Sequence, residues 1–143
     1  MPLTPPPRDS NGLVVPHDHD GILDGDTLIR GIPAVHIQDG RVTSGAFKSS
    51  VNNDPYLGMS VDLEKLTNGY VLQPRYEGAV KFPAIVPRNE ELLVGYDPVE
   101  GNTAHCGIWR TGDGGPVRMN KGKSRYLQRN CEWYLEVEGI SLR

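Results

Sequence analysis

Hydrophobic and polar positions alternate over short stretches of this chain, and glycine or proline closes most of them. Residues 27–32 form a β-type run that ends at Pro33, and residues 59–63 alternate with their apolar side chains on one face. Residues 133–142 close the chain with a similar alternation and a polar outer face. Each of these runs predicts a strand. Further strands are expected at residues 41–47, 70–72, 79–82, 92–96 and 104–109.

Helices are expected to be few and short, because 17 glycines and 12 prolines interrupt a chain of 143 residues. Residues 121–130 are the best helix candidate, and residues 33–38 and 64–68 suit single helical turns. The length and an apolar fraction of 37% match one domain. The sequence therefore predicts the α+β class: a small β-rich domain with a curved sheet or partial barrel of short strands and one or two short helices.

The N-terminal region differs in composition from the rest. Residues 1–21 are rich in proline and aspartate, and they have too few apolar side chains to offset the entropy of ordering them. We therefore expect a flexible Pro-rich arm followed by one globular domain over residues 22–143. The apolar triplet at residues 13–15 is the part that could anchor the arm on a protein partner.

Targeting signals also bear on where the chain acts. No stretch approaches the roughly 18 consecutive apolar residues that span a membrane. The N-terminus lacks the basic start and apolar run of a signal peptide. We expect a cytoplasmic protein without a membrane partner, in which Cys106 and Cys131 are free thiols.

Charge is unevenly distributed along the chain. The net charge is only −3, yet residues 118–131 contain five cations and no acid. Aromatic residues lie within or just after this segment, as single-stranded nucleic-acid binders require. A solvated helix face would carry the same charges, and a pI near 5.8 lacks the basic bias of such binders. The candidate nucleic-acid contacts are Arg118, Lys121, Lys123, Arg125 and Arg129.

Two sets of residues are candidates for metal or thiol chemistry. His17 and His19 project to the same side of an extended chain and are the candidate metal ligands. A metal site needs three or four ligands in rigid geometry, so we expect no resident metal. His105 and Cys106 are adjacent and face opposite sides of a strand, which leaves His105 with Cys131 as the open pairing. Buried, inert thiols are the expectation.

Three short motifs resemble those of a known enzyme family. LIRGI, VTSGAF and LEVEG, in that order, resemble the Arg…Ser-Thr-Ser…Glu-x-Glu pattern of mono-ADP-ribosyltransferases. The resemblance implies that Arg30 holds the phosphates of NAD, that Thr43 and Ser44 support the site, and that Glu138 binds ribose and stabilises an oxocarbenium-like transition state. Gly45 stands where the family has its third hydroxyl.

A second resemblance covers most of the chain. Runs such as VVPHDHDGI, LIRGIP, GRVTSGAF, GMSVDLEKL and VGYDPVEGNTAH resemble small uncharacterised bacterial proteins, which implies a bacterial or phage origin. The leading hypothesis is a binding or interaction domain without a cofactor, within a bacterial or phage multi-protein assembly or conflict system. The alternatives are an NAD-using ADP-ribosyltransferase-like enzyme and a nucleic-acid-binding module that uses residues 118–131.

Overall fold

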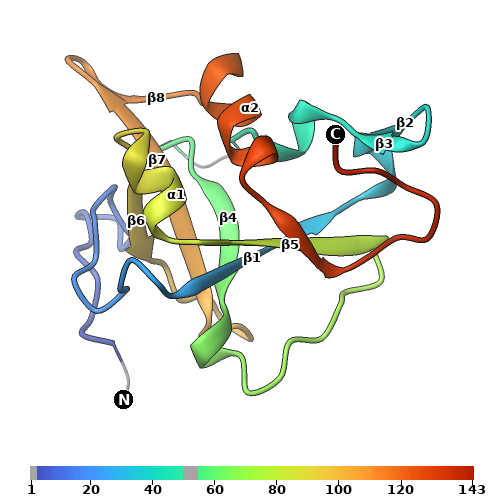
Figure 1. Ribbon diagram of the computed structural model, residues 1–143. Coiled ribbons are helices and arrows are strands. Elements are labelled where there is room, and N and C mark those ends of the chain that lie inside the picture. Colours follow the sequence, from blue (N-terminus) through green and yellow to red (C-terminus); the bar gives the residue numbers. More distant parts are fainter. Residues whose placement is uncertain (1–2, 50–54) are drawn as a thin grey trace.

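The computed structural model describes residues 3–49 and 55–143. Over these residues the chain has the predicted α+β class, with a seven-stranded antiparallel sheet and a separate two-stranded one (Figure 1). The main sheet has the order β6-β7-β4-β1-β5-β9, and β8 pairs with β7, so the sheet is open and not a closed barrel. The strands are β1 (Thr27–Ile32), β2 (Ile37–Gln38), β3 (Arg41–Val42), β4 (Met59–Leu63), β5 (Gly78–Pro83), β6 (Leu93–Tyr96), β7 (His105–Gly112), β8 (Gly115–Val117) and β9 (Glu132–Leu135).

Helical segments are short, as the glycine and proline content predicts. The longer α-helix is α2 (Lys121–Arg129), which begins where the Asn120 side chain accepts a hydrogen bond of 2.8 Å from the Lys123 amide. The sequence analysis did not predict α1 (Ile85–Asn89), whose Pro87 lies in the first turn, where proline is tolerated. The 3-10 turns are η1 (Ala34–His36), η2 (Ser44–Phe47) and η3 (Glu64–Leu66).

Three of the predicted strands differ from the structure. The run at residues 41–47 is a strand only as far as Val42, because η2 turns the chain so that Ala46 and Phe47 become buried. Residues 70–72, just after the turn at Gly69 (φ +100), form no strand. The last strand ends at Leu135, and a turn at Gly139 (φ +76) lets Leu142 return to the core.

A divergence between two neighbouring strands shapes the interior. β1 pairs with β5 along all six of its residues, but with β4 only through Leu28 and Ile29. Beyond Ile29 the two strands separate, and Figure 1 shows β4 crossing the direction of β1 and β5. The split leaves the Ser60 carbonyl without a ladder partner on β1. The cavity described below lies at this split.

The hydrophobic core lies on one face of the sheet. Leu28 on β1, Val61 on β4 and Phe82 on β5 contribute to it, and side chains of α2 and η2 cover it. These positions alternate along their strands, so the period-two pattern in the sequence predicted the inward face correctly. The largest fully buried side chains include Trp109, Phe47, Phe82, Ile22, Leu28, Ile32, Met59, Leu63, Ile108 and Leu127.

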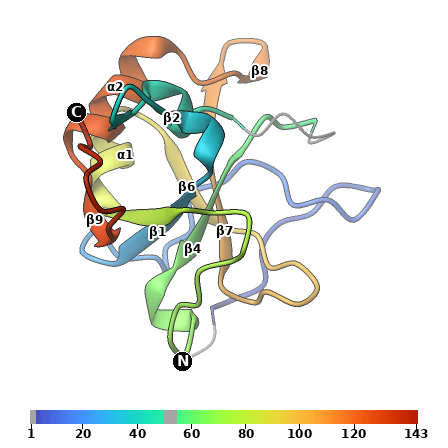
Figure 2. The same cartoon turned by 90° about the vertical axis from the view of Figure 1, so that its right-hand side faces the viewer.

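The N-terminal segment lies on the domain, which differs from the free arm expected from sequence. The His19 amide donates to the Val94 carbonyl (2.8 Å), and the Tyr96 amide donates to His17 Nε2 (3.1 Å), so the segment follows β6. His19 and Val14 are buried. Figure 2 shows this blue segment on the opposite side of the sheet from the red C-terminal strand. Among the described residues, no helix has the length and apolar character needed to cross a membrane.

Candidate functional site

A cavity of about 630 Å³ opens where β1 and β4 separate. Its walls come from β1, η1 and the chain after η2, together with residues 75–76 and 118–119. Small-molecule cavities in proteins commonly have volumes of roughly 300–1,000 Å³. The cavity is therefore large enough for an organic ligand of moderate size.

The lining of this cavity is strongly biased in charge. Arg30, Lys48, Arg75, Arg118 and the imidazole of His36 all contribute to it. None of the described residues that line it is acidic. A concave surface with one sign of charge concentrates the electrostatic potential within it. The cavity therefore favours an anion.

Arg30 is the most buried of these cations. Its Nε donates to the Ala46 carbonyl (2.6 Å), its Nη1 to the Ser60 carbonyl (2.5 Å) and its Nη2 to the Lys48 carbonyl (3.4 Å). Arg30 thus satisfies the Ser60 carbonyl at the strand split and fixes the end of η2. No described carboxylate forms an ion pair with it. A guanidinium has more N–H groups than these bonds use, so it keeps donor capacity for a ligand.

Two side chains that line the cavity have lowered pKa values. Burial lowers the pKa of the Arg30 guanidinium to about 10, which leaves it charged at neutral pH. Burial also lowers the pKa of His36, and the positive charges of Arg30 and Lys48 lower it further. The cations that lower the pKa of His36 are therefore the same ones that a bound anion would contact.

Apolar side chains also line the cavity. The Tyr76 ring lies flat against Gly31, where an added Cβ would come within 2.4 Å of the ring. The Arg75 guanidinium carbon lies 4.8 Å from the centre of the same ring. Because the ring contacts both neighbours, it forms a fixed wall. Pro33, Val35 and Met119 add apolar surface to the lining.

The cavity is joined to the start of α2. The Met119 amide donates to Ser49 Oγ (3.2 Å), and the Arg110 guanidinium donates to the Arg118 carbonyl (2.9 Å). These bonds hold residues 118–119 at the cavity wall, and α2 begins two residues later. Asn120 caps the helix at this junction.

The residues predicted from the ADP-ribosyltransferase resemblance are only partly brought to this cavity. Arg30 lines it, and so does Gly45, but Thr43, Ser44 and Glu138 are not among its lining residues. Glu138 is exposed and follows β9, which β5 separates from β1 in the sheet. The structure therefore places the glutamate outside the cavity that contains the arginine.

The two candidate metal-ligating histidines are held by hydrogen bonds. His17 Nδ1 lies 2.8 Å from the Val15 carbonyl, and its Nε2 accepts from the Tyr96 amide. His19 Nε2 lies 2.9 Å from the Thr4 carbonyl, and its Nδ1 accepts from the Gly21 amide (2.9 Å). All four ring nitrogens therefore have partners and are not available to a metal. The described residues contain no cluster of three or more side chains suited to hold one.

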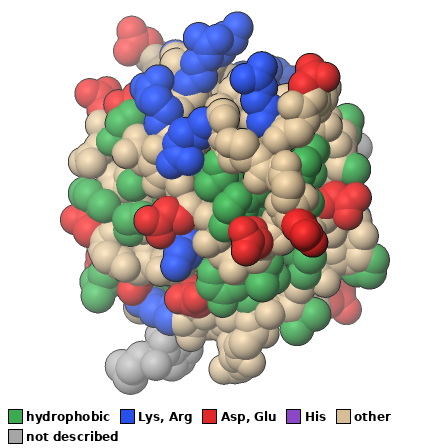
Figure 3. Space-filling view, turned by 45° about the vertical axis from the view of Figure 1, so that its right-hand side comes forward, with side chains coloured by type: hydrophobic (Ala, Val, Ile, Leu, Met, Phe, Trp, Pro, Cys, Tyr) green, Lys and Arg blue, Asp and Glu red, His purple; other side chains and the backbone are tan. Residues whose placement is uncertain are grey.

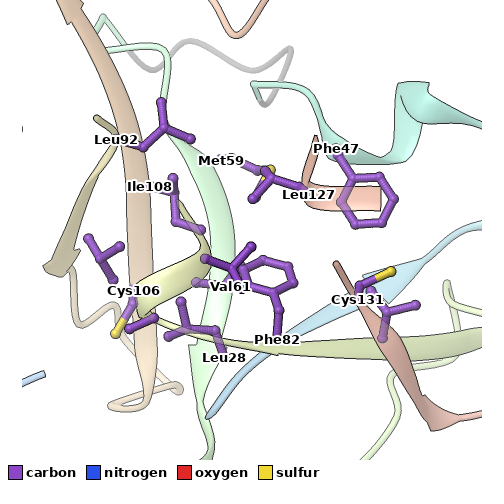
Figure 4. Packing of buried hydrophobic residues seen from close by; sticks show 14 of the residues in the cluster. Leu28, Phe47, Met59, Val61, Phe82, Leu92, Cys106, Ile108, Leu127 and Cys131 are labelled. Atoms are coloured by element: carbon purple, nitrogen blue, oxygen red, sulfur yellow. The ribbon is translucent and has the colours of Figure 1, made fainter. Parts of the chain in front are cut away.

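The thiols are far apart and buried. Figure 4 shows Cys106 and Cys131 on opposite sides of the hydrophobic cluster, and both are free. Burial raises the pKa of Cys106 to about 12 and that of Cys131 to about 11. His105 Nδ1 lies 2.7 Å from the Asp97 carbonyl. The expectation of inert thiols agrees with this environment.

The basic segment forms an exposed surface on α2. Figure 3 shows Lys and Arg side chains gathered at the top of the molecule, the end that carries α2. Lys123 is less exposed than the other cations of α2, and its Nζ donates to the Glu90 carbonyl (2.6 Å). The aromatic side chains expected beside these cations make other contacts. Tyr126 and Trp133 pack against the core, and the ring centres of Tyr134 and Tyr70 lie 5.6 Å apart.

Comparison of the chain with protein-family models, with curated proteins and with solved structures found no match. Sequence reasoning named Arg30 and Arg118 but missed His36, Lys48 and Arg75. A lone arginine in the apolar run of β1 was the available signal, since a buried cation in a strand needs an explanation.

Proposed function

We propose that this protein is a binding domain whose cavity at the β1–β4 split holds a phosphorylated organic ligand of the nucleotide class. The observation that carries the proposal is a cavity lined by several cations, one of them the half-buried Arg30, and by no described acid. A buried cation without a carboxylate partner is unfavourable unless hydrogen bonds or an anion compensate it. The three carbonyl contacts of Arg30 supply part of this compensation, and a ligand phosphate would supply the rest.

The rest of the lining suits the other part of such a ligand. Pro33, Val35, Met119 and the fixed Tyr76 ring offer apolar surface, and the Ser49 and Ser60 residues add polar groups. Ligand cavities typically combine apolar walls with a few polar groups that set orientation. A nucleotide has a planar ring for the apolar wall and a phosphate for the cations. Inorganic phosphate alone would leave most of the volume unfilled.

The NAD-using enzyme hypothesis shares Arg30 with this proposal but also needs Glu138 beside the ligand ribose. Glu138 does not line the cavity. Without a carboxylate at the ligand, an oxocarbenium-like transition state has no anion to stabilise it. This geometry favours binding over ADP-ribosyl transfer. NAD remains a suitable test ligand, because it contains the same phosphate and planar groups.

A protein partner of the N-terminal segment is a separate expectation. Of the apolar triplet at residues 13–15, Val14 is already buried within this chain and Leu13 is exposed. Leu13 is therefore the most accessible residue of the triplet, and Val15 is half-buried.

The test is thermal unfolding and calorimetric titration with adenosine monophosphate, NAD and uncharged adenosine. A ligand at a hundredfold excess over its Kd adds about 2.7 kcal/mol to the free energy of unfolding, which raises Tm by several degrees. We expect stabilisation by the phosphorylated ligands and not by adenosine. Lys48→Gln or Arg118→Gln removes one charged contact, and each should weaken binding by roughly tenfold or more.

Lys65→Gln is the matched control, because it removes the same charge from η3, the green turn at the far end of the molecule from α2 (Figure 1). It should leave ligand affinity unchanged. The proposal would be contradicted if adenosine stabilised the protein as much as the phosphorylated ligands do. It would also be contradicted if the Lys48 and Arg118 variants bound those ligands as tightly as the wild type does. Arg30 is unsuitable as the first variant, since its loss would also release η2.

A further inference from the structure

The geometry points to a single-stranded nucleic acid as the natural ligand, with one terminal nucleotide in the cavity and the adjoining phosphates along α2. This inference rests on the proposed function and extends it from a nucleotide to a strand. Its basis is a continuous series of cations that begins inside the cavity and continues on an exposed helix face.

The cations of α2 that are fully exposed lie on one side of the helix. Lys121, Arg125 and Arg129 are spaced four residues apart, so they stack along the same face. At about 1.5 Å per residue, each is roughly 6 Å along the axis from the next, and the row is about 12 Å long. These three residues are called the α2 row. None of them has an ion-pair partner among the described residues.

The α2 row begins at the cavity. Arg118 and Met119 line the cavity and Lys121 starts the helix, so the first cation of the row lies within a few residues of the cavity wall. At the other end, the Arg143 guanidinium donates to the carbonyls of Arg129 and Cys131, both at 3.2 Å. Arg143 thus adds a positive charge beyond Arg129. The sequence of α2 contains no acid that would interrupt the series.

A polymer of phosphates fits this arrangement better than a mononucleotide. A mononucleotide can engage only the cavity, whereas a strand that leaves the cavity meets a new cation at each turn of α2. Tyr126 and Trp133 are half-buried against the core and Tyr134 contacts Tyr70, which limits the aromatic surface for base stacking along the row. Binding along α2 should therefore depend on phosphate charge and on salt, with little dependence on base sequence.

The experiment measures two probes against three variants by fluorescence anisotropy and calorimetry. The probes are adenosine monophosphate and a fluorescein-labelled single-stranded DNA octamer of mixed sequence. The cavity variant is Lys48→Gln, the row variant is Arg125→Gln with Arg129→Gln, and the control is Lys65→Gln. Glutamine is a good helix former, so the row variant should keep α2 intact, and circular dichroism checks this.

We expect the octamer to bind at least tenfold more tightly than adenosine monophosphate at low salt. The cavity variant should weaken both probes, and the row variant should weaken the octamer alone. For single strands the slope of log K against log salt is about −0.7 per phosphate contact, so the row variant should reduce the slope by roughly 1.4.

The possible failures separate the two proposals. If adenosine monophosphate binds in the cavity but the octamer gains no affinity, or if the row variant binds the octamer as the Lys65 control does, the strand inference is wrong and the nucleotide proposal stands. If the octamer binds through the row while the cavity variant has no effect on either probe, both the cavity proposal and the strand inference are wrong. Absence of binding by both probes also overturns both.

Discussion

Arg30 lies where β1 leaves β4, and its guanidinium donates to the Ser60 carbonyl on β4 and to the Ala46 carbonyl of η2. The side chain therefore has a structural role before any ligand binds, because it satisfies backbone groups that the diverging strands leave unpaired. Burial of the guanidinium lowers its pKa to about 10, and the side chain also lines the cavity. One residue thus links the shape of the sheet to the charge of the site.

His36 provides a pH test of the site. Its folded pKa lies below the ordinary 6.5, so the unfolded chain takes up this proton first, and the free energy of unfolding falls as the pH drops through 6.5. A bound anion offsets the positive field and favours the protonated imidazole. We therefore expect the affinity for adenosine monophosphate, measured by calorimetry, to rise as the pH falls from 8 to 5.5.

His36→Gln should remove most of this rise while leaving affinity at pH 8 nearly unchanged, because the wild-type imidazole is neutral there. A flat affinity across this range for a probe whose charge does not change with pH would contradict an anion close to His36. The phosphate of the probe also titrates near pH 6. A sulfate ester of adenosine, which stays charged, separates the two effects.

At the level of elements, a pair of glycines determines where the N-terminal segment lies. Gly95 on β6 and Gly107 on β7 are directly opposite each other in the sheet. A Cβ on Gly95 would come within 2.5 Å of the His17 carbonyl oxygen, and one on Gly107 within 2.6 Å of the Trp109 ring. The bare backbone lets the rings of His17 and Trp109 lie 5.5 Å apart above it.

Gly95→Ala should therefore displace the N-terminal segment. We expect a loss of roughly 1–3 kcal/mol in the free energy of unfolding, because the contact is with backbone that cannot rotate away. Hydrogen exchange at the Tyr96 amide, which donates to His17 Nε2, should become faster. Gly25→Ala is the control, since a Cβ there meets nothing within 4 Å. Equal stability of the two variants would mean that the segment does not contact β6.

A second element-scale feature is η2, which occupies the place of a predicted strand. Phe47 and Ala46 are fully buried, and the Phe47 carbonyl accepts from the buried Ser124 hydroxyl at 2.8 Å. Arg30 and α2 thus hold η2 from two sides. Alternation in residues 41–47 could not reveal this, because the tertiary contacts outweigh a weak local strand preference.

On the scale of the whole molecule, the N-terminal segment and α2 cover different parts of the sheet. Arg88 on α1 donates to the carboxylates of Asp18 (2.9 Å) and Asp24 (2.8 Å), which ties the segment to the domain. Leu3 also packs against the core. Contacts between distant parts of the chain therefore stabilise the fold, and the bond between Tyr96 and His17 joins residues 79 positions apart.

Removal of residues 1–20 tests this organisation. We expect the truncated chain to lose about 2 kcal/mol or more in free energy of unfolding, because Trp109 would become exposed. Urea denaturation measures the loss, and Leu13→Ser serves as the control because Leu13 is exposed. A truncated protein that unfolds at the wild-type urea concentration would instead support the free arm predicted from the sequence.

The sequence by itself determined the local features of this protein. Alternation predicted β1 and β4 with their ends, and the basic run predicted α2, because periodicity and helix preference act over a few neighbouring residues. The α+β class followed from the spacing of glycine and proline. Of the candidate site, the sequence singled out Arg30 and Arg118.

The tertiary structure alone decided the rest. The order β7-β4-β1-β5 places strands beside each other that are distant in the chain, and the early end of the β1–β4 ladder creates the cavity. His36, Lys48 and Arg75 meet Arg118 there although no pattern joins them in the sequence. Packing and strand pairing are long-range effects, whereas sequence patterns report only the preferences of adjacent residues.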